Sequence, residues 1–148
     1  MIFFKYIIPT DEDKDWGIII NTAGHLIRPK DTEISSSDHP VKYALRENRG
    51  RVLDEFQVIY IIKGRGEYID ERNKKYPVNP GTIITVIPGK QHFYGPSKDT
   101  GWESYYIGFS GNFPIQLLKK GFFKSISPIL QLGLDEEIFE LFSKMLEL

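Results

Sequence analysis

The 148-residue sequence contains no cysteine, only three histidines and almost no net charge. Without cysteine the chain can form neither disulfides nor thiolate-ligated metal centres, and it has no thiolate nucleophile. The formal net charge is −1, from 19 basic and 20 acidic residues. The basic residues are scattered, whereas a DNA-binding surface concentrates them in a stripe. We therefore expect that this chain does not bind nucleic acid by itself.

Long hydrophobic runs are also lacking. No apolar stretch reaches the roughly 18 residues that a membrane-spanning helix requires, so we expect no membrane partner. The segment Met1–Ile8 is apolar but short, and it lacks the basic start and the cleavage site of a signal peptide. We interpret it as an opening strand or arm. The absence of cysteine fits a reducing compartment, and we expect a cytoplasmic protein.

Short apolar stretches of period two fill the chain from its start to about Gly111. Clusters of glycine, proline, serine, asparagine and aspartate separate these stretches, which is typical of an antiparallel sandwich or barrel. The length suits a single compact domain. The expected strands are Ile2–Ile8, Trp16–Ile20, His25–Arg28, Lys42–Arg46, Phe56–Lys63, Glu67–Ile69, Thr82–Ile87, His92–Tyr94 and Glu103–Phe109.

The pattern becomes helical after residue 111. We expect a short helix over 112–121, a second helical turn over 127–133, and a third helix from Asp135 to the end. In the third helix Ile138, Leu141, Phe142 and Met145 recur at helical spacing and form an apolar stripe. This helix has no stop signal at its end, so we expect the chain to be part of a longer protein.

One histidine follows a series of turns that has a known counterpart. A long strand, the hairpin Gly64-Arg-Gly66, the turn Asn79-Pro-Gly81, a strand and Pro88-Gly-Lys-Gln-His92 follow in order. This series resembles the cupin barrel. Metal-dependent cupins add a His-x-His pair and a glutamate near the long strand, but here the stretch reads Arg51-Val-Leu-Asp-Glu-Phe-Gln57. One imidazole cannot hold a metal ion, so we expect no metal and no cofactor.

Taken together, these motifs resemble a family of transcription regulators. Residues 51–66, Pro80-Gly81, Pro88–His92 and Trp102-Glu-Ser-Tyr-Tyr-Ile-Gly-Phe-Ser-Gly111 are similar to the N-terminal sensor domain of AraC-type regulators. The resemblance covers about residues 16–148. It implies a cupin-like antiparallel β-barrel over 1–111 that holds a small effector, often a sugar. It also implies a helical dimerisation segment over 112–148 and a separate C-terminal helix-turn-helix domain, absent from this sequence, that binds DNA.

The resemblance implies five ligand-binding residues: Arg51, His92, Tyr94, Ser104 and Tyr106. Strand parity supports the grouping, because residues two apart on a strand share a face. The expected cavity would hold a guanidinium, an imidazole, a hydroxyl and two phenols, a set that suits a polar small molecule.

Each of these residues also has a purely structural interpretation. Arg51 could form a surface ion pair with Asp54 or Glu55, and His92 could be a half-buried histidine bonded to a backbone carbonyl. Both tyrosines could be packing residues. Trp102 fits a core anchor better than a ligand contact, and the arm could be an edge strand or a lid.

We expect an effector-sensing and dimerisation domain without catalysis of its own, with Ile138, Leu141, Phe142 and Met145 at the homodimer contact. The same stripe could instead pack on its own barrel. Two other functions remain open at this point. One is a free-standing cupin enzyme, an isomerase or dioxygenase; the other is a structural oligomerisation domain whose barrel is filled by its own side chains.

Overall fold

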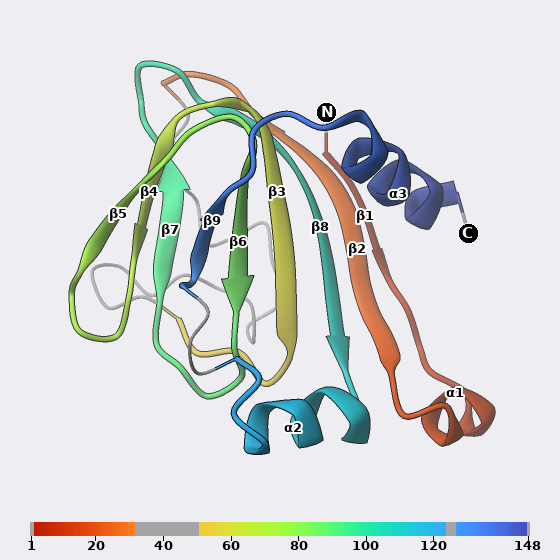
Figure 1. The fold of residues 1–148 in the computed structure, drawn as a ribbon. Helices are drawn as coiled ribbons and strands as arrows, with labels where there is room; N and C mark the ends of the chain where they lie inside the picture. Colours follow the sequence, from red (N-terminus) through yellow and green to blue (C-terminus); the bar gives the residue numbers. More distant parts are fainter. Residues whose placement is uncertain (1, 32–50, 124–126, 148) are drawn as a thin grey trace.

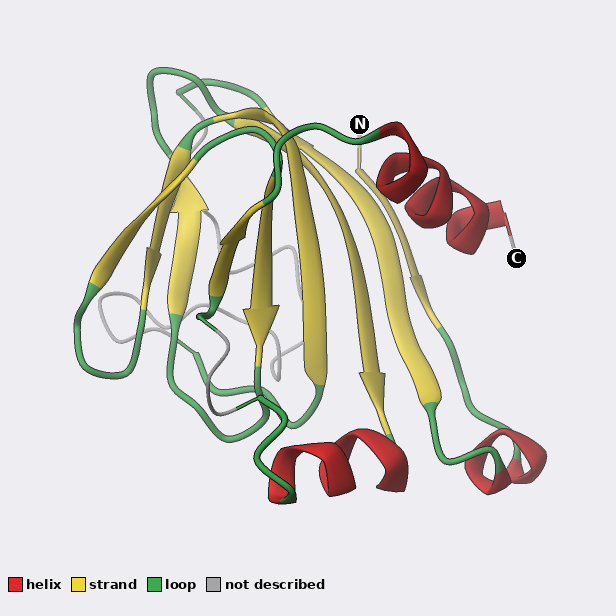
Figure 2. Cartoon of the chain, in the orientation of Figure 1, coloured by secondary structure: helices red, strands yellow, loops and turns green. Residues whose placement is uncertain are grey.

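Two antiparallel β-sheets and three helices make up the part of the chain that the structure describes (Figures 1 and 2). The structure is a computed structural model that describes residues 2–31, 51–123 and 127–147. The expected strand Lys42–Arg46 lies outside the described residues.

The larger sheet has six strands in the order β1-β2-β8-β3-β6-β9, and the smaller has three in the order β5-β4-β7. Every pairing is antiparallel, which confirms the predicted mainly antiparallel architecture. The strands are β1 Ile2–Tyr6, β2 Ile19–Arg28, β3 Phe56–Gly64, β4 Gly66–Ile69, β5 Lys75–Val78, β6 Thr82–Val86, β7 Phe93–Pro96, β8 Trp102–Ser110 and β9 Ile129–Gln131. The helices are α1 Asp11–Asp15, α2 Asn112–Lys119 and α3 Glu136–Glu147.

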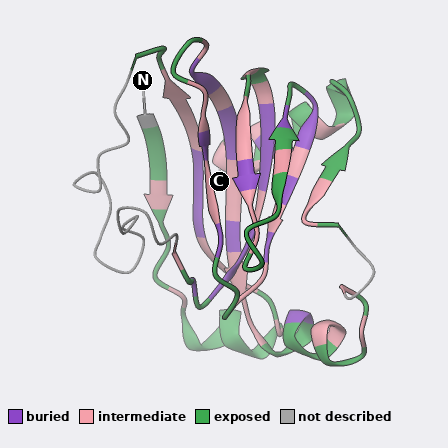
Figure 3. Ribbon diagram, turned by 90° about the vertical axis from the view of Figure 1, so that its left-hand side faces the viewer, coloured by how far each residue is buried: buried purple, intermediate pink, exposed green. Residues whose placement is uncertain are grey.

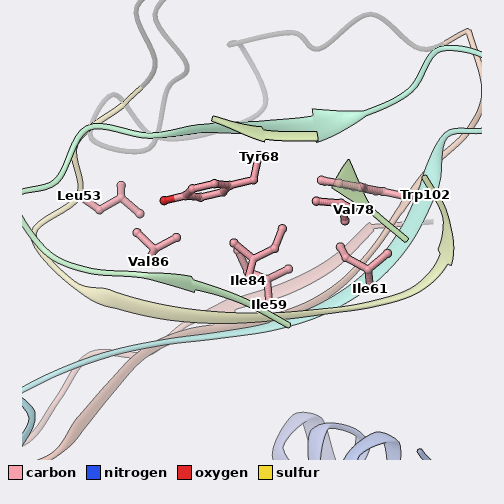
Figure 4. Packing of buried hydrophobic residues seen from close by; sticks show 8 residues of the cluster. All are labelled: Leu53, Ile59, Ile61, Tyr68, Val78, Ile84, Val86 and Trp102. Atoms are coloured by element: carbon pink, nitrogen blue, oxygen red, sulfur yellow. The ribbon is translucent and has the colours of Figure 1, made fainter. Parts of the chain in front are cut away.

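The main hydrophobic core lies between the facing sides of the two sheets (Figure 4). Alternate residues of a strand point to one face, so Ile59 and Ile61 of β3 both reach this core. Tyr68 of β4 lies opposite them in the smaller sheet. The buried members of the cluster are Leu53, Ile59, Ile61, Tyr68, Val78, Ile84, Val86 and Trp102. Burial is accordingly concentrated in the central strands, whereas α1 contributes no buried residue (Figure 3).

A second, smaller core forms on the outer face of the larger sheet, beneath α3. Phe142 is buried there against Tyr60 and Tyr105, with ring centroids 5.9 and 6.3 Å away. The Tyr60 hydroxyl also fixes the entry to the helix, because it accepts the Asp135 backbone N–H at 2.9 Å and donates to the Gly133 carbonyl at 3.2 Å. The long central strand β3 is therefore covered on both faces.

The apolar stripe of α3 is split between its own sheet and solvent. Ile138 and Met145 pack beside Phe142 on the outer core, whereas Leu141 is 61% exposed. Three of the four residues predicted for a dimer contact therefore cover their own sheet, as the second interpretation of this stripe expected.

The N-terminal arm is an edge strand of the larger sheet. β1 pairs with β2 along its whole length, with Tyr6 opposite Thr22. The arm also contacts α3, because Lys5 Nζ donates a hydrogen bond to the Leu146 backbone carbonyl at 3.1 Å. The arm therefore contacts both the neighbouring strand and the C-terminal helix (Figure 1).

The segment after α2 differs from the sequence prediction. A helical turn was expected over 127–133, but β9 is a strand there and pairs with β6. Ile129 lies opposite Ile84 and Leu130 opposite Ile83, so the last strand covers the edge of β6. Tertiary pairing of apolar residues with good β propensity outweighs the local Ser-Pro helix-start signal.

Two further elements of the N-terminal half were not predicted correctly. The separate strands expected over 16–20 and 25–28 form the single strand β2, and α1 was not predicted. A capping box starts α1: Thr10 Oγ1 accepts the Asp13 N–H at 3.2 Å, and Asp13 Oδ2 accepts the Thr10 N–H at 2.7 Å. No helix among the described residues has the length and apolar character that crossing a membrane would require.

Candidate functional site

A cavity of about 60 Å³ opens between the two sheets, on the side of β2 and β8. It is walled by inner-face residues of β2, β3 and β8, by β7 of the smaller sheet, by Arg51 before β3 and by one residue of the arm. The residues that line it are Tyr6, Thr22, Leu26, Arg28, Arg51, Gln57, Ile59, Tyr94, Gly95, Pro96, Trp102, Ser104 and Tyr106.

Strand register explains why these side chains share one wall. On β2 the cavity residues follow a period of two, and Leu26 and Arg28 lie opposite Ser104 and Trp102 of β8. Gly24 lies opposite Tyr106 and makes room for its ring, because a Cβ at position 24 would lie 2.5 Å from Tyr106 Cε1. The sheet itself therefore places Ser104 and Tyr106 in the cavity wall.

Arg51 and Tyr94 meet across the cavity. The guanidinium donates from Nη2 to the Tyr94 hydroxyl, and its Cζ lies 4.8 Å from the centre of the Tyr94 ring. A two-way backbone bridge to His92, with N···O distances of 2.8 and 3.0 Å, anchors Arg51 at the start of its segment. The Arg51 side chain thus lies in the cavity wall, while Glu55 is held by other partners.

His92 lies one layer behind the cavity and does not line it. Its ring stacks between Tyr68 and Tyr94, at centroid distances of 6.1 and 5.8 Å, and it is only 2% exposed. Burial, and to a smaller extent the nearby Arg51 charge, lower the pKa of His92 to about 4, against the opposing effect of the hydrogen bond to the Lys90 carbonyl. The ring is therefore neutral near pH 7: Nδ1 donates to that carbonyl at 3.1 Å, and Nε2 has no hydrogen-bond partner among the described residues.

The structure thus brings four of the five predicted residues, Arg51, Tyr94, Ser104 and Tyr106, to one cavity. Trp102 combines both of its interpretations, since it is 5% exposed in the core and also lines the cavity. Tyr6, Arg28 and Gln57 were not predicted. Arg28 and Leu26 share a face of the expected strand 25–28, but the sequence does not show that this face lines a cavity. Tyr6 reaches the cavity only because β1 pairs with β2.

A buried carboxylate fixes one end of the wall. Glu55 is 2% exposed and accepts from Asn21 Nδ2 and Gln57 Nε2, each at 2.9 Å. Thr22 donates its hydroxyl to the same carboxylate at 3.5 Å. Gly108 makes room for this network, because a Cβ there would lie 2.5 Å from Glu55 Oε1. Gln57 and Thr22 therefore face the cavity in fixed orientations.

A second hollow, of about 190 Å³, has a different character and lies where the end of β4, the end of β6 and the segment before β9 meet. Its lining includes both acids and bases, and Lys90 forms an ion pair with Glu71 at 3.9 Å. None of the five predicted ligand residues lines it. Within the described ranges, no group of three or more histidine, aspartate or glutamate side chains is arranged to hold a metal ion.

Comparison with known proteins places this architecture in context. The family model for the AraC-like ligand binding domain matches residues 39–148. No curated protein sequence gives a significant match.

Several solved structures are similar to this chain at low sequence identity. YhaK from Escherichia coli has a TM-score of 0.56 at 11% identity, over 91% of this chain and 52% of its own. ToxT from Vibrio cholerae, bound to an unsaturated fatty acid, has a TM-score of 0.48 at 12% identity, over 89% and 46%. A cupin-like protein from Thermotoga maritima has a TM-score of 0.41 at 15% identity, over 92% and 80%. The chain spans about half the length of YhaK and ToxT. The predicted mainly antiparallel β fold is confirmed, and YhaK shares it.

Proposed function

Because the chain belongs to the family of AraC-like ligand-binding domains, we propose that it is the effector-sensing and dimerisation part of an AraC-type transcription regulator. It binds a small molecule in the cavity between the sheets and thereby controls a separate DNA-binding domain. It acts in the cytoplasm and has no catalysis of its own. The observation that carries the proposal is the meeting of Arg51, Tyr94, Ser104 and Tyr106 around one cavity.

The chemistry of the wall supports a polar effector. The rings of Tyr94, Trp102 and Tyr106 offer apolar faces, and the arginine and hydroxyl groups offer hydrogen bonds that fix orientation. A carbohydrate is one class of molecule with this combination of a flat face and a rim of hydroxyl groups. His92, behind Tyr94, supports the ring from the rear and belongs to the site as a positioning residue.

Binding to both groups of the Arg51–Tyr94 pair requires part of the wall to move. The Arg51 guanidinium donates to the Tyr94 hydroxyl, so a ligand that binds both groups must separate them. The movable parts are the Arg51–Tyr94 contact and Tyr6 on the edge strand β1. A ligand that separates them shifts the population of arm positions, and the Lys5–Leu146 bond links the arm to α3.

The α3 helix is the proposed pairing element of a homodimer. Leu141, at 61% exposure, is its outward contact, while Ile138, Phe142 and Met145 hold the helix against the sheet from behind. Phe139 on the same helix is 40% exposed and Leu134 just before it is 67% exposed, so the apolar surface extends beyond one residue. Covering such a surface with a second copy removes it from water.

The proposal predicts ligand-dependent stabilisation of the folded chain. In a thermal-shift titration with sugars and other small metabolites, a true effector at 100 times its Kd adds about 2.7 kcal/mol to the free energy of unfolding. We expect Arg51→Ala and Tyr106→Ala to abolish this shift, because both side chains line the cavity. The exposed Arg65 provides the matched control, since Arg65→Ala leaves the cavity intact.

An equal shift in the wild type and in both cavity variants would contradict the assigned site. Lys90→Ala then tests the second hollow, which that lysine lines.

A further inference from the structure

Two arginines line the cavity, and none of its described lining residues is acidic. Arg28 comes from the end of β2, and Arg51 comes from the segment before β3. Guanidinium groups stay protonated, so each arginine offers positively charged hydrogen-bond donors to the cavity. In a partly desolvated site this charge attracts an anion far more strongly than it would in water.

The two arginines and a pair of aromatic residues line the same cavity. Arg28 is the strand partner of Trp102, and the Trp102 ring lies 6.0 Å from that of Tyr94. Arg51 lies over the other ring of the pair, 4.8 Å from its centre. A flat anionic group that contacts these rings is therefore within the reach of guanidinium donors from two different segments. Guanidinium and carboxylate groups match each other in planar, two-bond geometry.

The far end of the wall offers acceptors instead of positive charge. The register places Thr22 and Gln57 in one row, both opposite Gly108, while Arg28 and Trp102 share another row further along the sheet. A carboxylate only accepts hydrogen bonds, so the bond from Gln57 to Glu55 turns the amide NH₂ toward Glu55. The Gln57 carbonyl oxygen is then the group left for a bound hydroxyl. Ser104, between the two rows, adds a hydroxyl that can donate or accept.

From this arrangement we propose that the effector is a hydroxylated carboxylic acid, such as a sugar acid. Its carboxylate binds Arg28 and Arg51, its body lies against Trp102 and Tyr94, and its hydroxyl groups contact Ser104 and Gln57. This inference rests on the proposed sensing function and narrows the class of its ligand. A neutral sugar satisfies the acceptor end but offers no charged group to the guanidinium donors.

Isothermal titration of the 148-residue chain with matched acids and neutral compounds tests the inference. The pairs are D-gluconate with sorbitol, D-glucuronate with D-glucose, and D-galacturonate with D-galactose; hexanoate is an acid without hydroxyl groups. We expect at least one acid to bind about tenfold or more tightly than its neutral partner, and more tightly than hexanoate. Losing a charged hydrogen-bond partner weakens binding by about 10- to 100-fold.

The variants identify which side chains bind the acid. Arg28→Gln and Arg51→Gln should each weaken binding of that acid by about 10- to 100-fold, with partial recovery in Arg28→Lys and Arg51→Lys. Arg65→Gln removes an equal charge from an exposed ion pair with Asp99 and should leave the affinity unchanged. Ser104→Ala should weaken the binding of the hydroxylated acid but leave the binding of hexanoate unchanged. Circular dichroism and the Tm of each variant establish that it is folded.

The outcomes separate this inference from the sensing function itself. If a neutral compound binds as tightly as its acid, and Tyr106→Ala abolishes binding while both arginine-to-glutamine variants do not, the anionic class is wrong and the sensor remains. If hexanoate binds as tightly as the best sugar acid, the proposed contacts to the ligand hydroxyl groups are wrong. If no acid and no neutral compound binds up to about 10 mM, the inference and the sensing function both fail.

Discussion

At the scale of single residues, the buried His92 makes the stability of the folded chain depend on pH. In the unfolded chain a histidine titrates near pH 6.5, whereas burial lowers the pKa of His92 to about 4. Between these values the unfolded chain binds a proton that the folded chain does not bind. The free energy of unfolding should therefore decrease as the pH falls from about 6.5 to about 4, by up to about 3 kcal/mol. Below pH 4 this contribution becomes constant.

Urea denaturation of the wild type and of His92→Gln between pH 7 and pH 4 measures this effect. Other groups titrate in the same range, so the difference between the two proteins isolates the histidine. The wild type should lose stability more steeply than the variant. Parallel curves would show that the His92 ring is hydrated in the folded chain.

The residues of the site were predictable to the extent that they belong to an ordered series of motifs. Arg51, Tyr94, Ser104 and Tyr106 stand at fixed places in the strand and turn series, and the structure brings them to one cavity. Tyr6 and Gln57 were missed because their place depends on which strands become neighbours. His92 was grouped with Tyr94 because the two residues share a face of the strand. Strand parity does not show that Tyr94 lines the cavity whereas His92 stacks behind it.

At the scale of elements, α3 depends on one residue of its stripe more than on the others. Phe142 is 6% exposed and Leu141, the next residue back, is 61% exposed. We expect Phe142→Ala to reduce the free energy of unfolding by about 3–5 kcal/mol, because it leaves a cavity between Tyr60 and Tyr105. Leu141→Ala should change it by less than about 0.5 kcal/mol in the monomer. Urea denaturation at low protein concentration compares the two, and equal losses would contradict the packing of α3.

The same helix carries the test of the dimer. Leu141→Glu places a charge on the proposed contact without touching the outer core, so it should shift the chain from dimer to monomer at unchanged monomer stability. Sedimentation analysis over a range of concentrations measures this shift. The exposed Glu137 of the first turn provides a control through Glu137→Gln. A wild-type chain that is monomeric at all concentrations would refute pairing through α3 alone.

Element types were easier to predict than element partners. The helical period of residues 138–145 correctly indicated an amphipathic helix, but period alone does not say which surface the stripe covers. The strand β9 was mistaken for a helical turn because its three residues are too few to show a period. Its conformation is set by the open edge of β6, which lies more than 40 residues earlier in the chain.

At the scale of the whole molecule, we expect this fold to lack the metal-dependent chemistry of metal-binding cupins. The position before the long strand carries Arg51 and the next core position is Leu53, so this wall offers no imidazole pair. We expect less than about 0.1 equivalents of manganese, iron, nickel or zinc in the purified protein, and no change in Tm with a chelator. Elemental analysis by mass spectrometry checks the first expectation. A stoichiometric metal would favour the enzyme over the sensor.

The architecture as a whole was predicted from alternation and turns, because each short strand shows its own period and its own punctuation. What alternation cannot supply is the order of strands within a sheet. The sheet places β8 between β2 and β3, and this arrangement brings Arg28, Gln57 and Ser104 to one wall. The same strand order places β3 in the middle of the larger sheet. One face of β3 therefore contributes to the inner core and the other face to the outer core.

The pairing of β9 with β6 has a consequence for any shortened version of the chain. A fragment that stops at residue 111 keeps every strand of the cavity wall but loses the one that covers β6. The amide and carbonyl groups of β6 around Ile83 and Ile84 would then have no strand partner on that edge, and a strand of another molecule could pair with them. Such a fragment would aggregate through the uncovered edge of β6, and a ligand titration of it would report aggregation and not ligand binding.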